Sequence, residues 1–431
     1  MPDDRGGGFL PAASASVESG RSWVAAAATL AILSLSYGAP LIVVVDLARI
    51  QATLHTDRST VALASALVWL GTGLGGVAMG RLADRIGMRT IAAFGVMMMA
   101  GGLALSATGS VAALLVGHGL MMGLLGNGAL YPPLVVYVSR WFDRRRGTAI
   151  ALISSGLYVA GVLWPGPFER ASAAIGWQGT MLAYAGFLLA VGLPLALFLL
   201  RPAPQPASAS QATARTGTRQ EAGAAAGERV GVPGLSGHRV QGILCVASFL
   251  CCVAMAIPSA HLVAFAGSIG IPAGEGAAML SLMFGTAFAG RQLWGLLAER
   301  IGGLPTLLCS EICQATAMAL FAVTRNETAL FVLAAAYGLG FAGIIPSYVL
   351  VVRELFPFAE AATRIPLVLF TSMLGMAFGS WFAGVLFDRF GSYTPAFANG
   401  VLFNLANVAL VGFLLVRRSA ARLDAREPGV V

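Results

Sequence analysis

The sequence predicts an all-α integral membrane protein with twelve transmembrane helices in two pseudo-symmetric six-helix bundles. Of the 431 residues, 57% are hydrophobic and only 11% are charged, whereas soluble proteins carry about 25% charged residues. Apolar runs long enough to cross a hydrocarbon core of about 30 Å recur along the chain. A motif from the first half returns in the second half, and a polar segment separates the two.

The apolar runs fall into two sets of six. They cover residues 23–45, 61–80, 90–108, 112–138, 148–167 and 179–200, and then 240–266, 276–297, 304–323, 328–352, 365–386 and 396–416. The segment between the sets is rich in Ala, Gly, Pro, Ser and Thr, a composition typical of flexible linkers. We therefore expect an N-terminal tail over 1–22, a six-helix bundle over 23–200, a linker over 201–239, a second bundle over 240–418 and a tail over 419–431.

Arginine supplies all 27 basic residues, and the formal net charge is +8. If both termini lie in the cytoplasm, most of these arginines fall in cytoplasmic loops, as the positive-inside rule requires. We therefore expect a multi-pass protein of the cell (inner) membrane with both termini cytoplasmic. Because the charge is spread over many short loops, it does not form the clustered basic surface of a nucleic-acid-binding protein.

The two halves contain copies of one motif. The segment GRLADRIG at 80–87 matches GLLAERIG at 295–302. Pro132 and Phe142 match Pro346 and Phe356 in nearly the same register. Parallel duplication of six-helix halves places a substrate site at their interface, near the centre of the bilayer.

Arg291 is the most informative single residue. It precedes the charged pair Glu299 and Arg300 by eight residues, which places it about 12 Å deeper in a helix, near the bilayer midplane. A cation at that depth costs at least about 2.5–3.5 kcal/mol, so we expect it to face a polar cavity and to bind an anion. Its planar guanidinium matches a carboxylate with two parallel hydrogen bonds. The alternative is an arginine that only holds neighbouring helices together.

These motifs resemble the major facilitator superfamily, whose best-known motif is the GxLADRxG loop found at 80–87. Within that superfamily the chain is similar to the branch that holds the monocarboxylate transporters and the oxalate/formate antiporter. The similarity to this branch rests on WFDRRRGTA at 141–149, HLV at 261–263 and the Gly290-Arg291 pair. The resemblance implies the major facilitator fold, rocker-switch alternating access and a carboxylate-binding role for Arg291.

The chain departs from that branch at two places. Residues 367–386 contain no basic residue, whereas the oxalate carrier has a lysine there, so one deep cation suits one carboxylate better than two. Ala287 stands where animal monocarboxylate carriers have an aspartate, and this chain has no lysine. The resemblance therefore does not imply proton symport by their route.

Polar side chains on other predicted helices are candidates for contacts with a substrate. Asn127 and Tyr131 are one helical turn apart and share a face. The candidate substrate-binding residues are Arg291, Asn127, Tyr131, Tyr37, Tyr348, Tyr337 and His261, with Tyr158 and Asn399 as further candidates. The alternative role for each is a hydrogen bond between helices.

Three residues are candidates for proton coupling: His118, His261 and Glu311. A histidine can change its charge near neutral pH, but a lone histidine in a membrane helix can also be a packed hydrogen-bonding group. Glu311 could titrate, or it could pair with a cytoplasmic arginine such as Arg353.

Charged residues of the repeated motif lie at predicted cytoplasmic helix ends. Asp84, Arg85, Glu299 and Arg300 could form a conformational latch, in which charge pairs between the halves stabilise the outward-facing state. The alternative is that the arginines only anchor the topology. Asp46 is expected at the outer mouth.

The sequence thus indicates a secondary active transporter of a small organic anion, most simply a monocarboxylate, working by symport or antiport and with a co-transported proton as one option. The alternative is an efflux carrier for drug-like or other amphipathic compounds, whose transport would not depend on Arg291. The sequence shows no P-loop, no metal-ligand cluster and no nucleophile beside a base, so we expect neither an enzyme nor a bound cofactor or metal. We expect a monomer whose partners are its substrate and the lipid bilayer.

Overall fold

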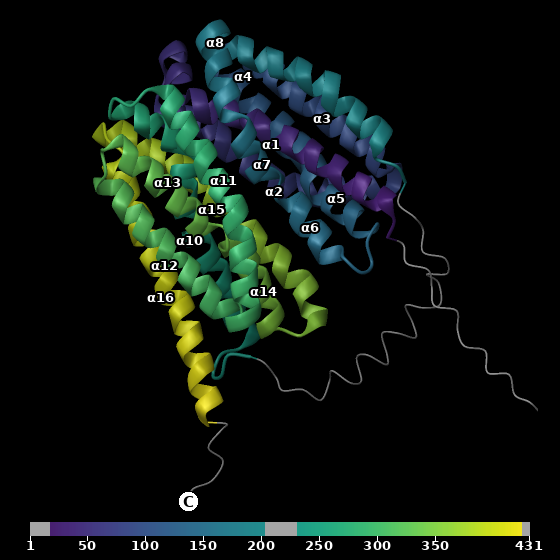
Figure 1. Ribbon diagram of the computed structural model, residues 1–431, viewed down its shortest axis with the longest axis vertical. Coiled ribbons are helices and arrows are strands. Elements are labelled where there is room, and N and C mark those ends of the chain that lie inside the picture. The colour runs from purple at the N-terminus through teal and green to yellow at the C-terminus, as the bar shows by residue number, and fades with distance from the viewer. Residues whose placement is uncertain (1–17, 203–230, 425–431) are drawn as a thin grey trace, which may run out of the picture.

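The protein folds into two helical bundles that pack side by side (Figure 1). The computed structural model describes residues 18–202 and 231–424. We call the described residues up to 202 the N half and those from 231 onward the C half. Most of the predicted N-terminal tail, most of the predicted linker and part of the predicted C-terminal tail lie outside the described residues.

The N half contains six helical spans, three of which are divided into shorter segments. They are α1 (Gly20–Leu54), α2 (Arg58–Ile86), α3 (Met88–Ser106), a fourth span of α4 (Val111–Val116), η1 (Gly117–Asn127) and α5 (Gly128–Ser139), a fifth of α6 (Arg146–Ser154) and α7 (Gly156–Leu163), and a sixth of α8 (Pro165–Phe187), η2 (Leu188–Gly192) and η3 (Leu195–Leu199).

The C half also contains six spans, of which one is divided. They are α10 (Gly237–Ser268), α11 (Ala273–Ile301), α12 (Gly303–Val323), a tenth span of α13 (Glu327–Phe341) and α14 (Ile344–Leu355), α15 (Phe358–Phe390) and α16 (Thr394–Asp424). The predicted all-helical fold of two six-helix bundles is confirmed.

One span differs from the others in composition. Eleven spans of the described chain are both long and apolar enough to cross a membrane, and α11 is not among them. This helix has 29 residues and carries Arg291. It packs against α7 and α8 of the N half and against α10, α12 and α13 of its own half. One face of α11 therefore packs on protein, while Leu282, Leu293 and Leu296 on its other face are exposed. Because Arg291 lies on the side that lines the interface of the halves, it avoids the cost of a charge that faces lipid.

Most helices extend beyond the predicted apolar runs; α1, for example, continues to Leu54 and α15 begins at Phe358. The first helix of the C half begins at Gly237, inside the predicted linker, because the Ser236 side chain accepts a hydrogen bond from the Arg239 N–H and caps the helix. The last helix continues to Asp424, beyond the predicted end at 418.

The repeated motif ends each time on a glycine with the same backbone conformation. Gly87 has φ 90° and Gly302 has φ 85°, a region that glycine enters without steric cost. Each glycine N–H donates to the carbonyl four residues earlier, at 3.0 Å. The chain therefore turns from α2 into α3, and from α11 into α12, within a single residue.

Glycines also allow close contacts between helices. A Cβ atom at Gly71 would lie 2.6 Å from the Leu124 nitrogen on η1. In the C half, a Cβ atom at Gly338 on α13 would overlap the carbonyl oxygen of Met283 on α11. In lipid, where apolar side chains gain little by leaving the solvent, such close packing is a main source of helix association.

The bundle has two ends. We call the end where α1 begins, near Gly20, and α16 finishes, near Asp424, the terminal end. The end where α1 finishes at Leu54 and α2 begins at Arg58 is the opposite end. The sequence-based topology predicts that the terminal end is cytoplasmic.

The packing of α13 on α11 yields a prediction. Gly338→Ala should lower thermal stability in detergent, at a cost of about 1–3 kcal/mol, because the added methyl group overpacks the contact with Met283. Gly242→Ala on α10 is the matched control, since no atom lies within 4 Å of its Cβ position. Equal melting temperatures for both variants would contradict this account.

Candidate functional site

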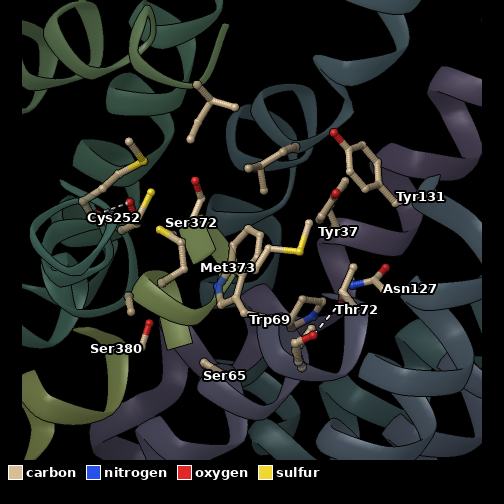
Figure 2. Close-up of a pocket in the computed structure, with 18 of the residues that line it drawn as sticks. Tyr37, Ser65, Trp69, Thr72, Asn127, Tyr131, Cys252, Ser372, Met373 and Ser380 are labelled. Atoms are coloured by element: carbon tan, nitrogen blue, oxygen red, sulfur yellow. Dashed lines mark hydrogen bonds between the residues drawn. The ribbon is translucent and has the colours of Figure 1, made fainter. Parts of the chain in front are cut away.

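A cavity of about 200 Å³ lies between the two halves. Its walls come from α1, α2, η1, α5, α6 and α7 of the N half and from α10, α11, α13, α14 and α15 of the C half. Figure 2 shows Tyr37, Asn127 and Tyr131 grouped on one side and Cys252 and Ser372 on the other. The position at the interface of the halves agrees with the place that the internal repeat predicts.

The cavity walls are largely apolar. Leucine, methionine and aromatic side chains such as Trp69, Met373 and Phe284 cover much of them. The polar groups are mainly hydroxyls of serine, threonine and tyrosine and the amide of Asn127. Arg291 is the one charged side chain among the described residues that line the cavity.

Arg291 lies against aromatic rings and not against an acid. Its guanidinium carbon is 5.6 Å from the ring centroid of Tyr158 on α7, which is within the range of a cation–π contact. The Tyr158 ring packs in turn on Phe284 and Phe341, at centroid distances of 6.3 and 6.2 Å. In the part of the chain that the structure describes, Arg291 forms no ion pair. A partly exposed, unpaired cation in an apolar cavity is suited to bind an anion.

Three other predicted ligands lie on the cavity wall. The rings of Tyr37 on α1 and Tyr131 on α5 meet edge to face, with centroids 5.8 Å apart. Asn127 is almost fully buried, and its Oδ1 accepts a hydrogen bond from the Ser36 hydroxyl. That contact occupies its oxygen and leaves the amide N–H groups for a ligand. Tyr158, a further candidate from the sequence, also lines the cavity.

Tyr337, Tyr348 and His261, which are candidate substrate-binding residues by sequence, do not line the cavity. All three are fully buried inside the C half. The Tyr337 hydroxyl donates to the Met255 carbonyl at 3.4 Å. The two ring nitrogens of His261 lie 3.0 Å from the Tyr393 hydroxyl and 2.7 Å from the Ser380 carbonyl. The alternative that the sequence left open, hydrogen bonding between helices, applies to these residues.

The other proton-coupling candidates also lie away from the cavity wall. His118 is buried in the N half, with Nδ1 3.1 Å from the Ser106 hydroxyl and 3.0 Å from the Leu114 carbonyl. Glu311 is buried in the C half and accepts a hydrogen bond from Tyr348 at 3.1 Å. The expected pairing of Glu311 with Arg353 is therefore wrong.

The predicted latch residues lie at the terminal end. Asp84 pairs with Arg140 of its own half at 2.8 Å, and both side chains are more than half exposed, so the pair contributes little to stability. Arg85, Glu299 and Arg300 are exposed, and in residues 18–202 and 231–424 they form no ion pair. The latch was predicted for the outward-facing state and stays a prediction.

Asp46 was expected at the outer mouth. It lies near the opposite end as defined above, where α1 finishes, and its side chain is buried. Its carboxylate accepts hydrogen bonds from Arg49, at 2.7 Å, and from Ser172. Arg49 also contacts Glu169 on α8 at 3.2 Å. This network joins the kinked end of α1 to α8.

The sequence analysis missed the wall residues of α2 and α15. On α15, Ser372, Met376 and Ser380 are spaced four residues apart, which places them on one helical face. On α2, Ser65 and Trp69 have the same spacing. Serines that recur at helical spacing within apolar runs were the sequence feature from which these wall residues could have been predicted.

The two halves contact each other at the opposite end. Asp388 of α15 accepts hydrogen bonds from the backbone N–H groups of Arg58, at 2.9 Å, and Ser59, at 2.8 Å. These groups belong to the first turn of α2, which lacks intrahelical partners for its N–H groups. The Arg58 guanidinium stacks on Phe387 at 3.6 Å and donates to Tyr393 at 3.1 Å. One half thus caps a helix of the other.

Two six-helix halves with a central cavity at their interface define a membrane transporter of the secondary type. The chain belongs to the Major Facilitator Superfamily. The sequence model of that family matches residues 24–240 and 242–429.

Relatives of known name are distant in sequence. MFS-type transporter 1 of Ophiocordyceps sp. (strain BCC 1869) is 24% identical over 290 residues, and the match spans 65% of this chain but only 60% of that protein. Monocarboxylate transporter 13 of Rattus norvegicus is 26% identical over 336 residues, covering 75% of this chain and 73% of the relative. Monocarboxylate transporter 11 of Homo sapiens is 28% identical over 404 residues, covering 88% and 80%.

Solved structures share the fold at low identity. A bacterial homologue of the human lysosomal transporter Spinster, in an inward-facing and occupied conformation, has a TM-score of 0.67 and 17% identity, covering 94% of this chain and 97% of that one. A point mutant of the nucleoside transporter NupG has a TM-score of 0.68 and 15% identity, covering 92% and 99%. At these identities the likeness supports the fold alone.

The cap formed by Asp388 yields a prediction. Asp388→Ala should increase the population with the opposite end open by about fivefold, because removing a helix cap costs about 1 kcal/mol. Spin labels attached through Ala52→Cys and Thr328→Cys, in a background without the native cysteines, would report this as a longer distance component. Glu275→Ala is the control, since this exposed acid lies in the first turn of α11 at the same end and forms no ion pair among the described residues. An unchanged distance distribution in Asp388→Ala would count against the cap.

Proposed function

We propose that this protein is a secondary active transporter of a small organic anion, most simply a monocarboxylate, and that Arg291 binds the carboxylate. The observation that carries the proposal is the unpaired guanidinium of Arg291 in an apolar cavity between the two halves. Burying a cation without an acid partner is costly. A bound carboxylate supplies the missing negative charge and removes that cost.

The surroundings of Arg291 favour a carboxylate over other anions. The planar guanidinium can donate two parallel hydrogen bonds to the two carboxylate oxygens. The Tyr158 ring beside it restricts the orientation of the side chain. Asn127, Tyr131 and Tyr37 add amide and hydroxyl groups on the wall of the N half. The apolar remainder of the wall suits the hydrocarbon part of a monocarboxylate.

Transport follows from alternating access. In this structure the cap of Asp388 on α2 holds the opposite end closed. Rocking of the halves breaks this contact and brings their terminal ends together, where Asp84, Arg85, Glu299 and Arg300 form the latch. The carrier works as a monomer in the cell membrane with both termini cytoplasmic, driven by symport or antiport and with a co-transported proton as one option.

One observation favours a second function. The cavity contains many apolar groups, including Trp69, Met373 and Met376, and only one charge. Such a surface suits drug-like or other amphipathic compounds, as in an efflux carrier. In that case transport depends on Trp69 and the methionines, and it persists without Arg291.

Replacement of Arg291 tests the proposal. Arg291→Ala should weaken the binding of pyruvate or benzoate by about 100-fold, because removing one member of a buried charged pair costs about 2–5 kcal/mol. Binding to the purified carrier in nanodiscs would be measured by scintillation proximity with labelled ligand.

Arg389→Ala is the matched control, because this exposed arginine stacks on Phe390 at the opposite end, away from the cavity. Wild-type uptake of every carboxylate by the Arg291 variant would remove the anion assignment. Retained transport of an uncharged amphipath by that variant would then favour the efflux carrier.

The latch yields a separate prediction. Asp84→Asn should slow transport by about two- to fivefold while leaving substrate affinity unchanged, because an exposed ion pair is worth about 0.2–1 kcal/mol. The exchange rate and the Kd would be measured on the same preparation. An unchanged exchange rate, or an equal loss of affinity, would argue that Asp84 has no role in the conformational cycle.

A further inference from the structure

A buried acid lies in the C half, behind the cavity wall. Glu311 on α12 is fully buried; its Oε1 contacts Tyr348, and its Oε2 has no hydrogen-bond partner among the described residues. In that part of the chain no arginine lies within ion-pair distance of it. A buried carboxylate without a cation is costly, so this group requires a neutralising proton in the present conformation.

The hydrogen bonds around Tyr348 lead to the same conclusion. The Tyr348 hydroxyl oxygen lies 3.1 Å from Glu311 Oε1 and 3.0 Å from Asn407 Oδ1. Both of these atoms are acceptors, but a hydroxyl has one hydrogen to donate. A proton on Glu311 Oε1 satisfies all three groups, because Glu311 then donates to Tyr348 and Tyr348 donates to Asn407. Without that proton, one of the two contacts must break or the Asn407 amide must rotate.

None of the arginines on the neighbouring helices forms an ion pair with this acid in the described residues. The groups around Glu311 and Tyr348 are thiols, phenols and amides: Cys251 and Cys252 on α10, Gln314 on α12, Tyr337 on α13 and Asn407 on α16. Within that part of the chain, Glu311 Oε2 and the Asn407 amide nitrogen have no hydrogen-bond partner. The cluster therefore has spare hydrogen-bonding capacity that a rearrangement could use.

A short path of contacts joins this cluster to the cavity. Tyr348 belongs to α14, and Ile345, one turn earlier on that helix, lines the cavity. The tenth span is broken just before α14, and Gly343 at the break packs closely against Trp294 of α11. Trp294 lies one turn from Arg291, and its indole N–H donates to the Leu339 carbonyl at 2.6 Å. A shift of α14 therefore acts on the helix turn that carries Arg291.

We propose that Glu311 takes up and releases one proton during the transport cycle, and that α14 conveys this change to the cavity wall beside Arg291. On uptake, a proton from water forms an O–H bond at Oε1 and the carboxylate becomes neutral. On release, that O–H bond breaks and the proton returns to water; the Tyr348 hydroxyl then loses its hydrogen bond to either Glu311 or Asn407, and α14 moves. This inference rests on the proposed function, because it makes Glu311 the coupling group for transport through the Arg291 cavity.

The first experiment needs no substrate. Infrared difference spectra of the purified carrier in nanodiscs, taken between about pH 5 and about pH 9, should show the band of a buried protonated carboxyl that disappears at high pH. The band should be absent in Glu311→Gln. It should persist in Glu354→Gln, the matched control, whose carboxylate pairs with Arg418 at the terminal end of the same half. A pH-independent band, or no band assignable to Glu311, overturns the proposal.

A second variant covers the case in which Glu311→Gln does not fold. Tyr348→Phe keeps the ring and removes the hydroxyl that contacts Glu311. It should move the pH midpoint of the carboxyl band by about one unit, because it removes a hydrogen bond to the group that titrates. An unchanged midpoint in a folded Tyr348→Phe carrier contradicts the proposed contact.

The coupling is tested in proteoliposomes with labelled benzoate and pyruvate. A gradient of about one pH unit supports about tenfold accumulation when one proton accompanies each substrate. Glu311→Gln, which mimics the protonated acid, should abolish this accumulation while retaining exchange at equal pH. Glu327→Gln, at an exposed acid in the first turn of α13, should retain both. Full gradient-driven accumulation by Glu311→Gln overturns the coupling role. If the wild type carries neither acid, the monocarboxylate proposal fails, and the infrared result still decides whether Glu311 exchanges a proton.

Discussion

An unpaired guanidinium in an apolar cavity is the constraint on which the rest of this structure depends. Arg291 is tolerated because the face of α11 that carries it packs on helices of both halves and because the Tyr158 ring lies beside the guanidinium. Of the twelve described spans, α11 is the one that does not meet the length and hydropathy expected of a membrane-crossing helix. The position of one charge therefore indicates which face of α11 turns to the interface of the halves and where an anion can bind.

Close contacts at the interfaces allow two halves to move as rigid bodies. Glycines such as Gly338 hold helices together within one half at backbone distance. Between the halves, the cap of Asp388 on α2 is polar and lies near the surface at the opposite end. The halves also pack closely on each other, as where Gly161 of α7 meets Phe284 of α11. At the opposite end, however, their contacts are hydrogen bonds near the surface that solvent can replace. Such replaceable contacts suit a carrier whose halves rock about a central site.

The broken tenth span connects two sites that are distant in sequence. Glu311 and Tyr348 lie in the interior of the C half, and Trp294 lies next to the cavity. If the tenth span were one continuous helix, the segment that contacts Glu311 could not move relative to the segment that contacts Trp294. The break before α14 gives the short helix its own freedom, so a change in hydrogen bonding at Glu311 can reach the wall without unfolding any span.

The sequence by itself determined the number of spans, the duplication and the interior position of Arg291, because hydropathy, repeat register and depth along a helix are one-dimensional properties. It did not determine which way each side chain points. Tyr337, Tyr348 and His261 are polar residues at a depth that suits substrate contacts. In the structure, however, their side chains are buried inside their own half. Only the tertiary structure decided this, because the rotation of a helix about its axis is set by packing against its neighbours.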